Sequence, residues 1–349
     1  MAIRVLVVDD SVFMRSMLKG ALADSAGIEV IGTAMNGTEG LKKIRELKPD
    51  VVTLDVEMPG LTGLQVLETV MKECPTPVVV VSTKTQEGAR TTLDALQLGA
   101  VDYVAKPLAD KNASLEGFRA GVVRAVQTAA VANKRHLTGK RGPVPAARPM
   151  ADFSPDAVVA IGISAGGPQT LHQMIPAFPA KFPPVLITQH MPEGFTGPFA
   201  NRLNDQAQGE VLEARDGDPI APGHIYIAPG SHHLRLAKKN GRLVTSLDGG
   251  PKVSGFRPSV DVLFESVSGL VGGSAVGVVM TGMGCDGSVG IRLLKAKGAA
   301  TIAQDQETSI VYGMPKAAKE TGCIDRICAL GEIPTAIAEA LSAHVVGAH

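Results

Sequence analysis

The sequence contains no tryptophan, few aromatic residues (3%), and no excess of charge of either sign. Lysine plus arginine and aspartate plus glutamate both number 34, so the formal net charge is zero at pH 7. A neutral chain gives no general electrostatic attraction to nucleic acid or to an anionic membrane surface. We therefore expect no nucleic-acid partner.

Cysteine is scarce, and the cysteines lack the paired short spacing of a zinc site. They are Cys74, Cys285, Cys323 and Cys328. Near the N-terminus, Arg4, Asp9 and Asp10 interrupt any apolar stretch, so we expect no secretory signal. A reduced protein of the cytoplasm is the expectation.

Long uncharged stretches are also scarce, and the one at 266–285 is long enough to suggest a membrane helix. It contains six glycines, which favour a buried strand and a tight loop instead. We expect no membrane insertion.

At 349 residues the chain is long enough for two domains with sizeable cores.

The first 130 residues alternate short apolar runs with helical patterns. Apolar residues at helical spacing from Met14 to Leu22 predict a helix with Ser11 as its N-cap. Five such strand and helix pairs predict a doubly wound parallel sheet of flavodoxin-like type. The apolar runs lie at 5–8, 30–31, 51–54, 78–81 and 100–105.

The alternation of apolar runs and helical patterns becomes irregular from about residue 127. The segment 133–155 is rich in proline and in basic residues. This composition predicts a linker, whose charge we interpret as solvated, although a contact surface is an alternative. From Ala157 a second alternating pattern predicts a Rossmann-like α/β domain, with 223–230 and 234–244 as an appended β-hairpin. The expected organisation is a first domain at 1–130, a linker at 131–155 and a second domain at 156–349.

Polar side chains follow the strands of the first domain. Asp9 and Asp10 end the first strand, Asp55 the third and Ser82 the fourth, and Lys106 follows the fifth. The carboxyl ends of parallel strands meet in one crevice. Carboxylates crowded together repel one another and need a cation, and Mg²⁺ suits this set of oxygen ligands. One of the carboxylates could attack a phosphoryl group, with the metal offsetting the charge of its oxygens. The alternative is that these aspartates merely solvate loops.

A second set of polar residues follows the strands of the second domain. Ser164 lies in a Gly-x-Ser-x-Gly turn after an apolar run, His190 follows a second run, and Asp286 follows a third through a Gly-Met-Gly turn. If the three runs are strands of one parallel sheet, all three side chains lie in the crevice at its carboxyl ends. They predict a serine hydrolase in which His190 takes the Ser164 proton and Asp286 fixes the imidazole tautomer. Amides near Ser164 and in the 282–284 turn are oxyanion-hole candidates, worth ~3 kcal/mol per donor.

Two other interpretations exist for this second set. The glycines at 162–167 could form a dinucleotide-binding loop, but such a loop expects an acidic residue roughly 20 positions later, near where this chain has His190. His190 could also be a structural histidine. The order Ser, His, Asp differs from that of α/β-hydrolases, which argues against that fold but not against a triad.

Residues 1 to about 125 resemble the receiver domain of two-component response regulators through the strand-end residues of the first domain. The resemblance implies that Asp55 is the phosphoacceptor, that Ser82 and Lys106 contact the phosphoryl group, and that Tyr103 tracks activation. It also implies a Mg²⁺ site, formed by Asp9, Asp10, Asp55 and Glu57.

The whole chain resembles the CheB family of chemotaxis response-regulator methylesterases. The resemblance rests on 9–15 (DDSVFMR), 187–192 (ITQHMP), 226–230 (YIAPG), 257–261 (RPSVD) and 281–287 (TGMGCDG). It implies that Ser164, His190 and Asp286 hydrolyse glutamyl methyl esters, and deamidate glutamines, on methyl-accepting chemoreceptors. Met283 is implied to donate its amide to the oxyanion hole, and ester hydrolysis is implied to need no cofactor.

The same resemblance implies a chemotaxis histidine kinase as phosphodonor, a cytoplasmic protein transiently at receptor arrays, and a receiver that covers the crevice until Asp55 is phosphorylated. A monomer is expected.

His233 and Arg257 are candidate substrate contacts, whereas Cys285 is interpreted as a packing residue. Ala165 replaces the hydroxyl residue often found there. The remaining histidines are interpreted as structural or solvated: His136, His172, His224, His344 and His349.

The sequence also bears on two other functional classes. A non-enzymatic signalling adaptor would keep the fold, but it would not explain an intact Ser164, His190 and Asp286. A DNA-binding response regulator would need a basic helix-turn-helix domain, and the neutral, glycine-rich second half offers none.

Overall fold

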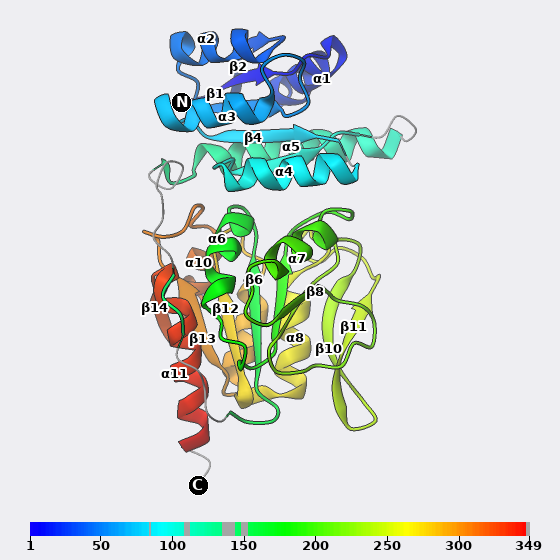
Figure 1. Ribbon diagram of the computed structural model, residues 1–349, viewed down its shortest axis with the longest axis vertical. Helices are drawn as coiled ribbons and strands as arrows, with labels where there is room; N and C mark the ends of the chain where they lie inside the picture. The colour runs from blue at the N-terminus through cyan, green and yellow to red at the C-terminus, as the bar shows by residue number, and fades with distance from the viewer. Residues whose placement is uncertain (84, 108–111, 135–143, 148–152, 347–349) are drawn as a thin grey trace. The chain divides into compact units, whose positions relative to one another are not determined.

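The computed structural model describes residues 1–83, 85–107, 112–134, 144–147 and 153–346. The chain forms two compact units, Met1–Lys140 and Arg141–His349, each an α/β structure built on its own sheet (Figure 1). This confirms the predicted fold class of two parallel-sheet domains. The boundary between the units falls within the predicted linker at 131–155, much of which lies outside the described residues, as do His136 and His349.

The first unit has a five-stranded sheet in the order β2-β1-β3-β4-β5, and every neighbouring pair is parallel. Its strands are β1 (Ile3–Val8), β2 (Ile28–Ala34), β3 (Val51–Asp55), β4 (Val78–Ser82) and β5 (Asp102–Ala105). Its helices are α1 (Val12–Ala23), α2 (Gly37–Leu47), α3 (Gly63–Glu73), α4 (Gln86–Gln97) and α5 (Asn112–Ala130). The central strands β3 and β4 are buried along their whole length, as expected for a parallel sheet with helices on both faces.

Local sequence explains how this sheet ends at its carboxyl edge. Ser11 caps α1 as predicted, because its hydroxyl accepts a hydrogen bond from the Met14 amide at 3.3 Å. At the end of β3, a Cβ atom on Gly63 would lie 2.1 Å from the Asp55 carbonyl oxygen. Only glycine therefore lets α3 begin so close to Asp55.

The second unit has a seven-stranded sheet in the order β14-β13-β12-β6-β7-β9-β8, parallel throughout. Its strands are β6 (Val158–Ile163), β7 (Val185–Gln189), β8 (Glu210–Glu213), β9 (His224–Ile227), β12 (Ala275–Val279), β13 (Ala300–Gln304) and β14 (Arg326–Cys328). Its helices are α6 (Gly167–Met174), α7 (Thr196–Asn204), α8 (Val260–Leu270), α9 (Ser288–Ala296), α10 (Met314–Glu320) and α11 (Ile333–Val346), with 3₁₀ turns η2 (Ile175–Ala177), η3 (Gly272–Ser274) and η4 (Leu330–Glu332).

An antiparallel hairpin accompanies this sheet, but its first arm differs from the prediction. The hairpin consists of β10 (His233–Lys239) and β11 (Arg242–Asp248), whereas the predicted arm at 223–230 contains β9, which pairs in parallel with β7 and β8. The apolar residues 225–227 are buried between two neighbouring strands, which a short run alone does not distinguish from a hairpin arm.

The order of strands reverses at β6, from which the chain continues to β7 on one side and later returns to β12 on the other. Ligands of open α/β sheets bind at such a switch point, outside the carboxyl ends of the strands. Ser164, His190 and Asp286 follow β6, β7 and β12, so all three lie at the switch point.

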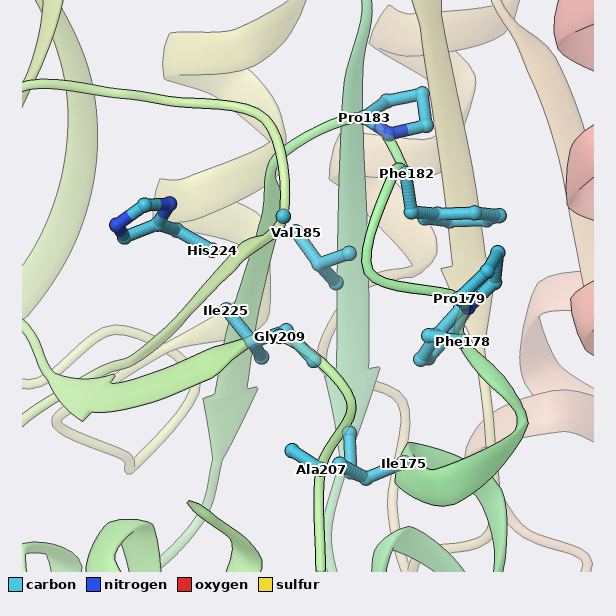
Figure 2. A pocket seen from close by; sticks show the side chains of 11 residues that line it. Ile175, Phe178, Pro179, Phe182, Pro183, Val185, Ala207, Gly209, His224 and Ile225 are labelled. Atoms are coloured by element: carbon cyan, nitrogen blue, oxygen red, sulfur yellow. The ribbon is translucent and has the colours of Figure 1, made fainter. Parts of the chain in front are cut away.

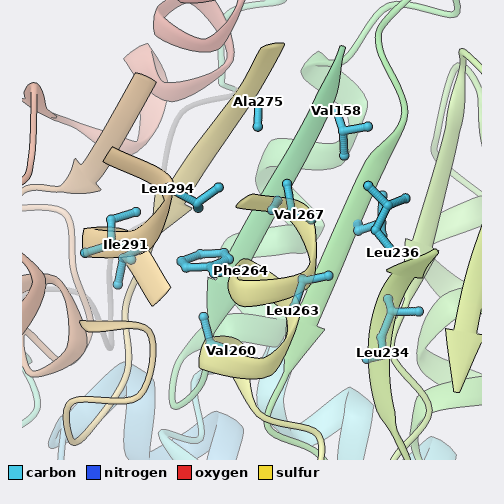
Figure 3. Close-up of a cluster of buried hydrophobic side chains, with 14 of the residues drawn as sticks. Val158, Leu234, Leu236, Val260, Leu263, Phe264, Val267, Ala275, Ile291 and Leu294 are labelled. Atoms are coloured by element: carbon cyan, nitrogen blue, oxygen red, sulfur yellow. The ribbon is translucent and has the colours of Figure 1, made fainter. Parts of the chain in front are cut away.

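Buried apolar residues fix α8 and α9 against the sheet. Figure 3 shows Phe264 of α8 facing Ile291 and Leu294 of α9, and all three side chains are 0% exposed. A Cβ atom on Gly162 of β6 would lie 2.2 Å from Val260, so α8 touches the strand at its first residue. Burial of each large apolar side chain stabilises this packing by ~2 kcal/mol. The N-terminus of α8 is therefore held firmly beside the switch point.

The uncharged stretch at 266–285 is divided among the end of α8, η3, β12 and the turn that follows. Within the described parts of the chain, no helix is both long and apolar enough to cross a bilayer.

Candidate active site

The second unit brings Ser164, His190 and Asp286 into one chain of contacts. Ser164 Oγ lies 3.1 Å from His190 Nδ1, and His190 Nε2 lies 2.8 Å from Asp286 Oδ2. Both distances are within hydrogen-bonding reach. The His190 side chain is 5% exposed and that of Asp286 is fully buried. A hydroxyl, an imidazole and a carboxylate are thus linked in a site largely screened from water.

The imidazole uses its two nitrogens in an order opposite to that of the chymotrypsin triad. There Nε2 faces the serine, whereas here Nδ1 does and Nε2 faces the carboxylate. An ionised carboxylate only accepts hydrogen bonds, so Nε2 carries the proton of the neutral ring. The lone pair of Nδ1 is therefore left to face the Ser164 hydroxyl.

The Asp286 carboxylate is held by the start of α8. It accepts hydrogen bonds from the Ser259 hydroxyl at 2.8 Å, the Val260 amide at 2.8 Å and the Asp261 amide at 3.0 Å. Burial alone would raise the pKa of Asp286, but the hydrogen bonds from His190 and from these amides hold it below its ordinary value of 3.8. The helix dipole favours the same charge. Asp286 is therefore the ionised partner that the imidazole needs.

Asp261 at the start of α8 in turn accepts hydrogen bonds from the start of α9, a contact that the sequence did not reveal. Its Oδ1 accepts hydrogen bonds from the amides of Gly287, Val289 and Gly290 at the start of α9, directly after Asp286. Burial raises the pKa of Asp261 to about 6 despite these amides. A serine and an aspartate next to the apolar residues at 260–264 were the signal that could have indicated this pair of caps.

The 281–284 turn passes close to Ser164. The Ser164 amide donates to the Thr281 carbonyl at 2.9 Å, and a Cβ atom on Gly282 would lie 2.7 Å from Ser164 Cβ. Only glycine permits this approach. The Ser164 amide is thus engaged, whereas the amides of Ala165 and Met283 make no hydrogen bond to any described residue. These two amides are therefore candidates to bind an oxyanion.

One face of the imidazole is covered by an aromatic ring that the sequence did not indicate. Phe256 stacks on His190 with 3.8 Å between ring centroids and 6° between the ring planes. Its side chain is half-buried. The contact joins residues far apart in sequence, and no local pattern predicts it.

The two candidate substrate contacts both hydrogen-bond to the backbone around Phe256. His233 is 1% exposed, its Nδ1 accepts from the Ser259 amide at 3.1 Å, and its Nε2 donates to the Pro251 carbonyl at 2.9 Å. Arg257 Nη1 donates to the carbonyls of Gly249 and Gly250. These contacts give both residues a structural role, and binding of substrate by either stays a prediction.

The first unit gathers the predicted acidic residues at the carboxyl end of its sheet. Carboxylate oxygens of Asp9, Asp10 and Asp55 lie within 4.8 Å of one another. Lys106 Nζ donates to Asp55 Oδ2 at 2.6 Å and lies 3.4 Å from Asp9 Oδ2. Burial raises the pKa of Asp55 to about 6, although Lys106 lowers it. One ammonium group therefore faces several acidic groups.

These residues fit a bound Mg²⁺ ion. Asp9 Oδ2 is buried and accepts no hydrogen bond from a described residue. Oxygen ligands from one or two carboxylates, completed by water, are what Mg²⁺ prefers. Glu57, also predicted for the metal, lies outside the cluster, and its exposed carboxylate accepts from the Thr83 hydroxyl at 3.1 Å.

The remaining predicted receiver residues line the neighbouring strands. Ser82, at the end of β4, is buried, and its hydroxyl donates to the Gly88 carbonyl at 3.2 Å. Tyr103 lies on β5 opposite Val80 and is half-buried. Burial raises the pKa of the Tyr103 hydroxyl, which favours its neutral form. How either residue responds to phosphorylation stays a prediction.

An apolar pocket in the second unit lies away from the triad. Figure 2 shows it lined by Phe178, Phe182, Val185 and Ile225 among others. Val185 begins β7, whereas His190 follows the carboxyl end of that strand. The pocket therefore lies toward the amino end of β7, away from the end that His190 follows.

Comparison with known proteins gives matches to both units. Residues 159–337 match the CheB methylesterase family, and residues 5–115 match the response regulator receiver domain. A protein-glutamate methylesterase/protein-glutamine glutaminase of Sulfurimonas denitrificans is 44% identical over 352 residues, covering 98% of this chain and 99% of that protein. One from Pyrococcus abyssi is 41% identical over 344 residues, covering 97% and 94%. The crystal structure of the Thermotoga maritima CheB methylesterase catalytic domain is 40% identical, covers 52% of this chain and 97% of that chain, and has a TM-score of 0.52.

Proposed function

Since this chain belongs to the CheB methylesterase family and carries a response regulator receiver domain, we propose that it is a protein-glutamate methylesterase and protein-glutamine glutaminase acting in chemotactic adaptation. Its substrates are methyl-accepting chemoreceptors. The observation that carries the proposal is the contact chain from Ser164 through His190 to Asp286 at the switch point. We assign 1–130 as the receiver, 131–155 as the linker and 156–349 as the catalytic domain.

Acylation follows from the geometry of these three residues. His190 Nδ1 removes the Ser164 proton while Oγ attacks the carbonyl carbon of a glutamate γ-methyl ester. The imidazolium that forms is stabilised by Asp286, and the amides of Met283 and Ala165 donate to the tetrahedral oxyanion. When the intermediate collapses, the bond to the methoxy group breaks, and Nδ1 returns the proton so that methanol leaves.

Deacylation repeats these steps with water. His190 Nδ1 takes a proton from the water molecule, whose oxygen attacks the acyl-Ser164 carbon, and then returns a proton to Oγ as the glutamate carboxylic acid is released and ionises. A glutamine substrate follows the same path with ammonia as the leaving group. His190 carries each proton that moves between Ser164, water and the leaving group, and these steps use no cofactor.

The receiver supplies control. Asp9, Asp10 and Asp55 would hold Mg²⁺, whose charge offsets that of the phosphoryl oxygens. Asp55 attacks the phosphorus of a phosphohistidine on the kinase, the N–P bond breaks, and the kinase imidazole leaves. Lys106 neutralises the phosphoryl oxygens, and the Ser82 hydroxyl turns from Gly88 toward them. Phosphorylation then relieves the inhibition of the catalytic domain by the receiver, as a two-state switch biased by local charge.

The test is methanol release from methylated receptor membranes, with and without a small phosphodonor and Mg²⁺. The wild type should release methanol, faster with the phosphodonor, and Ser164→Ala should release none while Asp55 is still phosphorylated. Release by Ser164→Ala would refute the triad. No release by the wild type under any condition would favour a signalling adaptor.

A further inference from the structure

The proton transfers above leave one contact of His190 without a role. We propose that Phe256 is a positioning residue, which holds the His190 imidazole at the distance from Ser164 that proton transfer requires. The inference rests on the proposed function, because it assigns His190 as the base. It concerns the stacked contact of the two rings, whose centroids are 3.8 Å apart and whose planes differ by 6°.

The two hydrogen bonds of the imidazole cannot do this alone. Those to Ser164 and Asp286 run from the two ring nitrogens and therefore lie close to the ring plane. Such bonds resist motion within the plane far more than motion along its normal. Phe256 lies along that normal and blocks displacement toward one side. A displacement of about 1 Å in a catalytic group can lower a rate on the order of a hundredfold.

The loop that carries Phe256 is built to hold it. Val253 and Phe256 exchange backbone hydrogen bonds of 3.0 and 2.9 Å around Ser254 and Gly255, whose φ angles are +53° and +83°. Left-handed angles at both central residues are typical of a tight type I′ turn. Outside this turn, Arg257 and His233 tie the loop through their backbone contacts to residues 249–251.

The same segment of chain also supports the carboxylate. Directly after the loop come Ser259, Val260 and Asp261, which donate three hydrogen bonds to Asp286. Residues 249–261 therefore contact the base through Phe256 and the acid through the start of α8. This continuity fixes the spacing between the stacked ring and the carboxylate that orients Nε2.

The stack also favours the charge that develops during reaction. The face of a phenyl ring is the negative side of its quadrupole and attracts a cation above it. The imidazole is neutral before proton transfer and positive in the transition state. An interaction that strengthens in the transition state raises kcat without lowering KM. Loss of Phe256 should therefore reduce kcat and leave KM for the receptor nearly unchanged.

The experiment compares Phe256→Ala, Phe256→Leu and Phe256→Tyr in the full-length protein, with Val253→Ala as a control in the same turn. One readout is methanol release from receptor membranes, resolved into kcat and KM. The other is the rate of Ser164 labelling by a small fluorophosphonate, which has no receptor to contact. Labelling of Ser164→Ala gives the background.

Phe256→Ala and Phe256→Leu should lower both kcat and the labelling rate by about tenfold or more, while KM stays within about threefold. Phe256→Tyr, which keeps the ring, and Val253→Ala should stay within about threefold of the wild type in both readouts. If Phe256→Ala unfolds, Phe256→Leu decides, because leucine fills the space without a planar face.

A Phe256→Leu variant as fast as the wild type would overturn the inference, and so would a loss confined to KM for the receptor, which would make Phe256 a substrate contact. Failure of the proposed function looks different: the wild type would label at Ser164 but release no methanol, and the labelling rates would still test Phe256. A wild type that labels no faster than Ser164→Ala would overturn both.

Discussion

Ser259→Ala should weaken the support of Asp286 without removing it. The Ser259 hydroxyl is fully buried and donates to Asp286 Oδ1 at 2.8 Å. Ser259 makes no side-chain cap to an α8 amide, since Asp286 itself accepts from the amides of Val260 and Asp261. The substitution therefore removes one charged hydrogen bond and leaves the helix terminus satisfied. A hydrogen bond to a charged group contributes about 1.5–3 kcal/mol, which is the expected loss in free energy of unfolding at pH 7.

The loss should depend on pH in a definite direction. The pKa of Asp286 lies below its ordinary value of 3.8, so its ionised form stabilises the fold above that pH, and this contribution disappears as the pH falls through the folded pKa. Removing the Ser259 donor raises the folded pKa. The difference in stability between wild type and Ser259→Ala should therefore be largest at neutral pH and shrink below about pH 4.

Catalysis should suffer less from Ser259→Ala than from Asp286→Asn. In Ser259→Ala the carboxylate keeps His190 and two amides as donors, so Nε2 stays protonated and kcat should fall by about tenfold. In Asp286→Asn the neutral amide no longer fixes the tautomer, and the matching change in a serine protease costs on the order of 10⁴ in kcat.

The assay combines scanning calorimetry of the full-length protein at pH 7 and at pH 3 with hydrogen exchange at the first α8 amides and with methanol release. Ser268→Ala is the matched control, because the Ser268 hydroxyl donates within α8, to the Glu265 carbonyl, and not to Asp286. The reasoning would be refuted if Ser259→Ala unfolded and exchanged like the wild type at pH 7, or if its stability loss were the same at both pH values.

Three further outcomes are expected. Gly282→Ala should lower methanol release by about a hundredfold with Asp55 phosphorylation intact, because a Cβ atom there would lie 2.7 Å from Ser164 Cβ; unchanged release would contradict the close approach of the turn. Removal of residues 1 to about 150 should raise basal methanol release, and a truncated form no faster than the unphosphorylated whole would refute inhibition by the receiver. Chelation of Mg²⁺ by EDTA should abolish stimulation by the phosphodonor and leave the basal rate unchanged, and a drop in the basal rate would place a metal in the esterase site.

The triad could be predicted because a parallel sheet converts sequence position into spatial position. Ser164, His190 and Asp286 each follow an apolar run, and the carboxyl ends of such strands share one edge. The same rule brought Asp9, Asp10 and Asp55 together. The rule needs each run to be a strand of one parallel sheet, and the alternation of apolar runs with helical patterns predicted this for the runs that precede these residues.

The parts that sequence did not reveal depend on contacts between distant loops. Phe256 contacts His190 from a loop between β11 and α8. The sequence pattern also does not indicate which ring nitrogen of His190 faces Ser164. The sequence predicts a hairpin arm at 223–230, where the structure has a parallel strand, because a short apolar run does not show which strand it pairs with. The sequence shows Asp261 only as part of the 257–261 motif. Its hydrogen bond from the Gly290 amide at the start of α9 depends on how α8 and α9 pack together.

The placement of β12 beside β6 has a consequence for synthesis of the chain. Ser164 and His190 are 26 residues apart and follow consecutive strands, but Asp286 comes 96 residues after His190 and follows a strand that pairs on the other side of β6. Domains are made from the N-terminus at roughly 5–20 residues per second, so several seconds separate the emergence of the histidine from that of the acid. Throughout that interval the nascent chain has a nucleophile and a base but no carboxylate to orient the ring. The esterase is thus expected to stay silent on the ribosome until nearly the whole polypeptide has been translated.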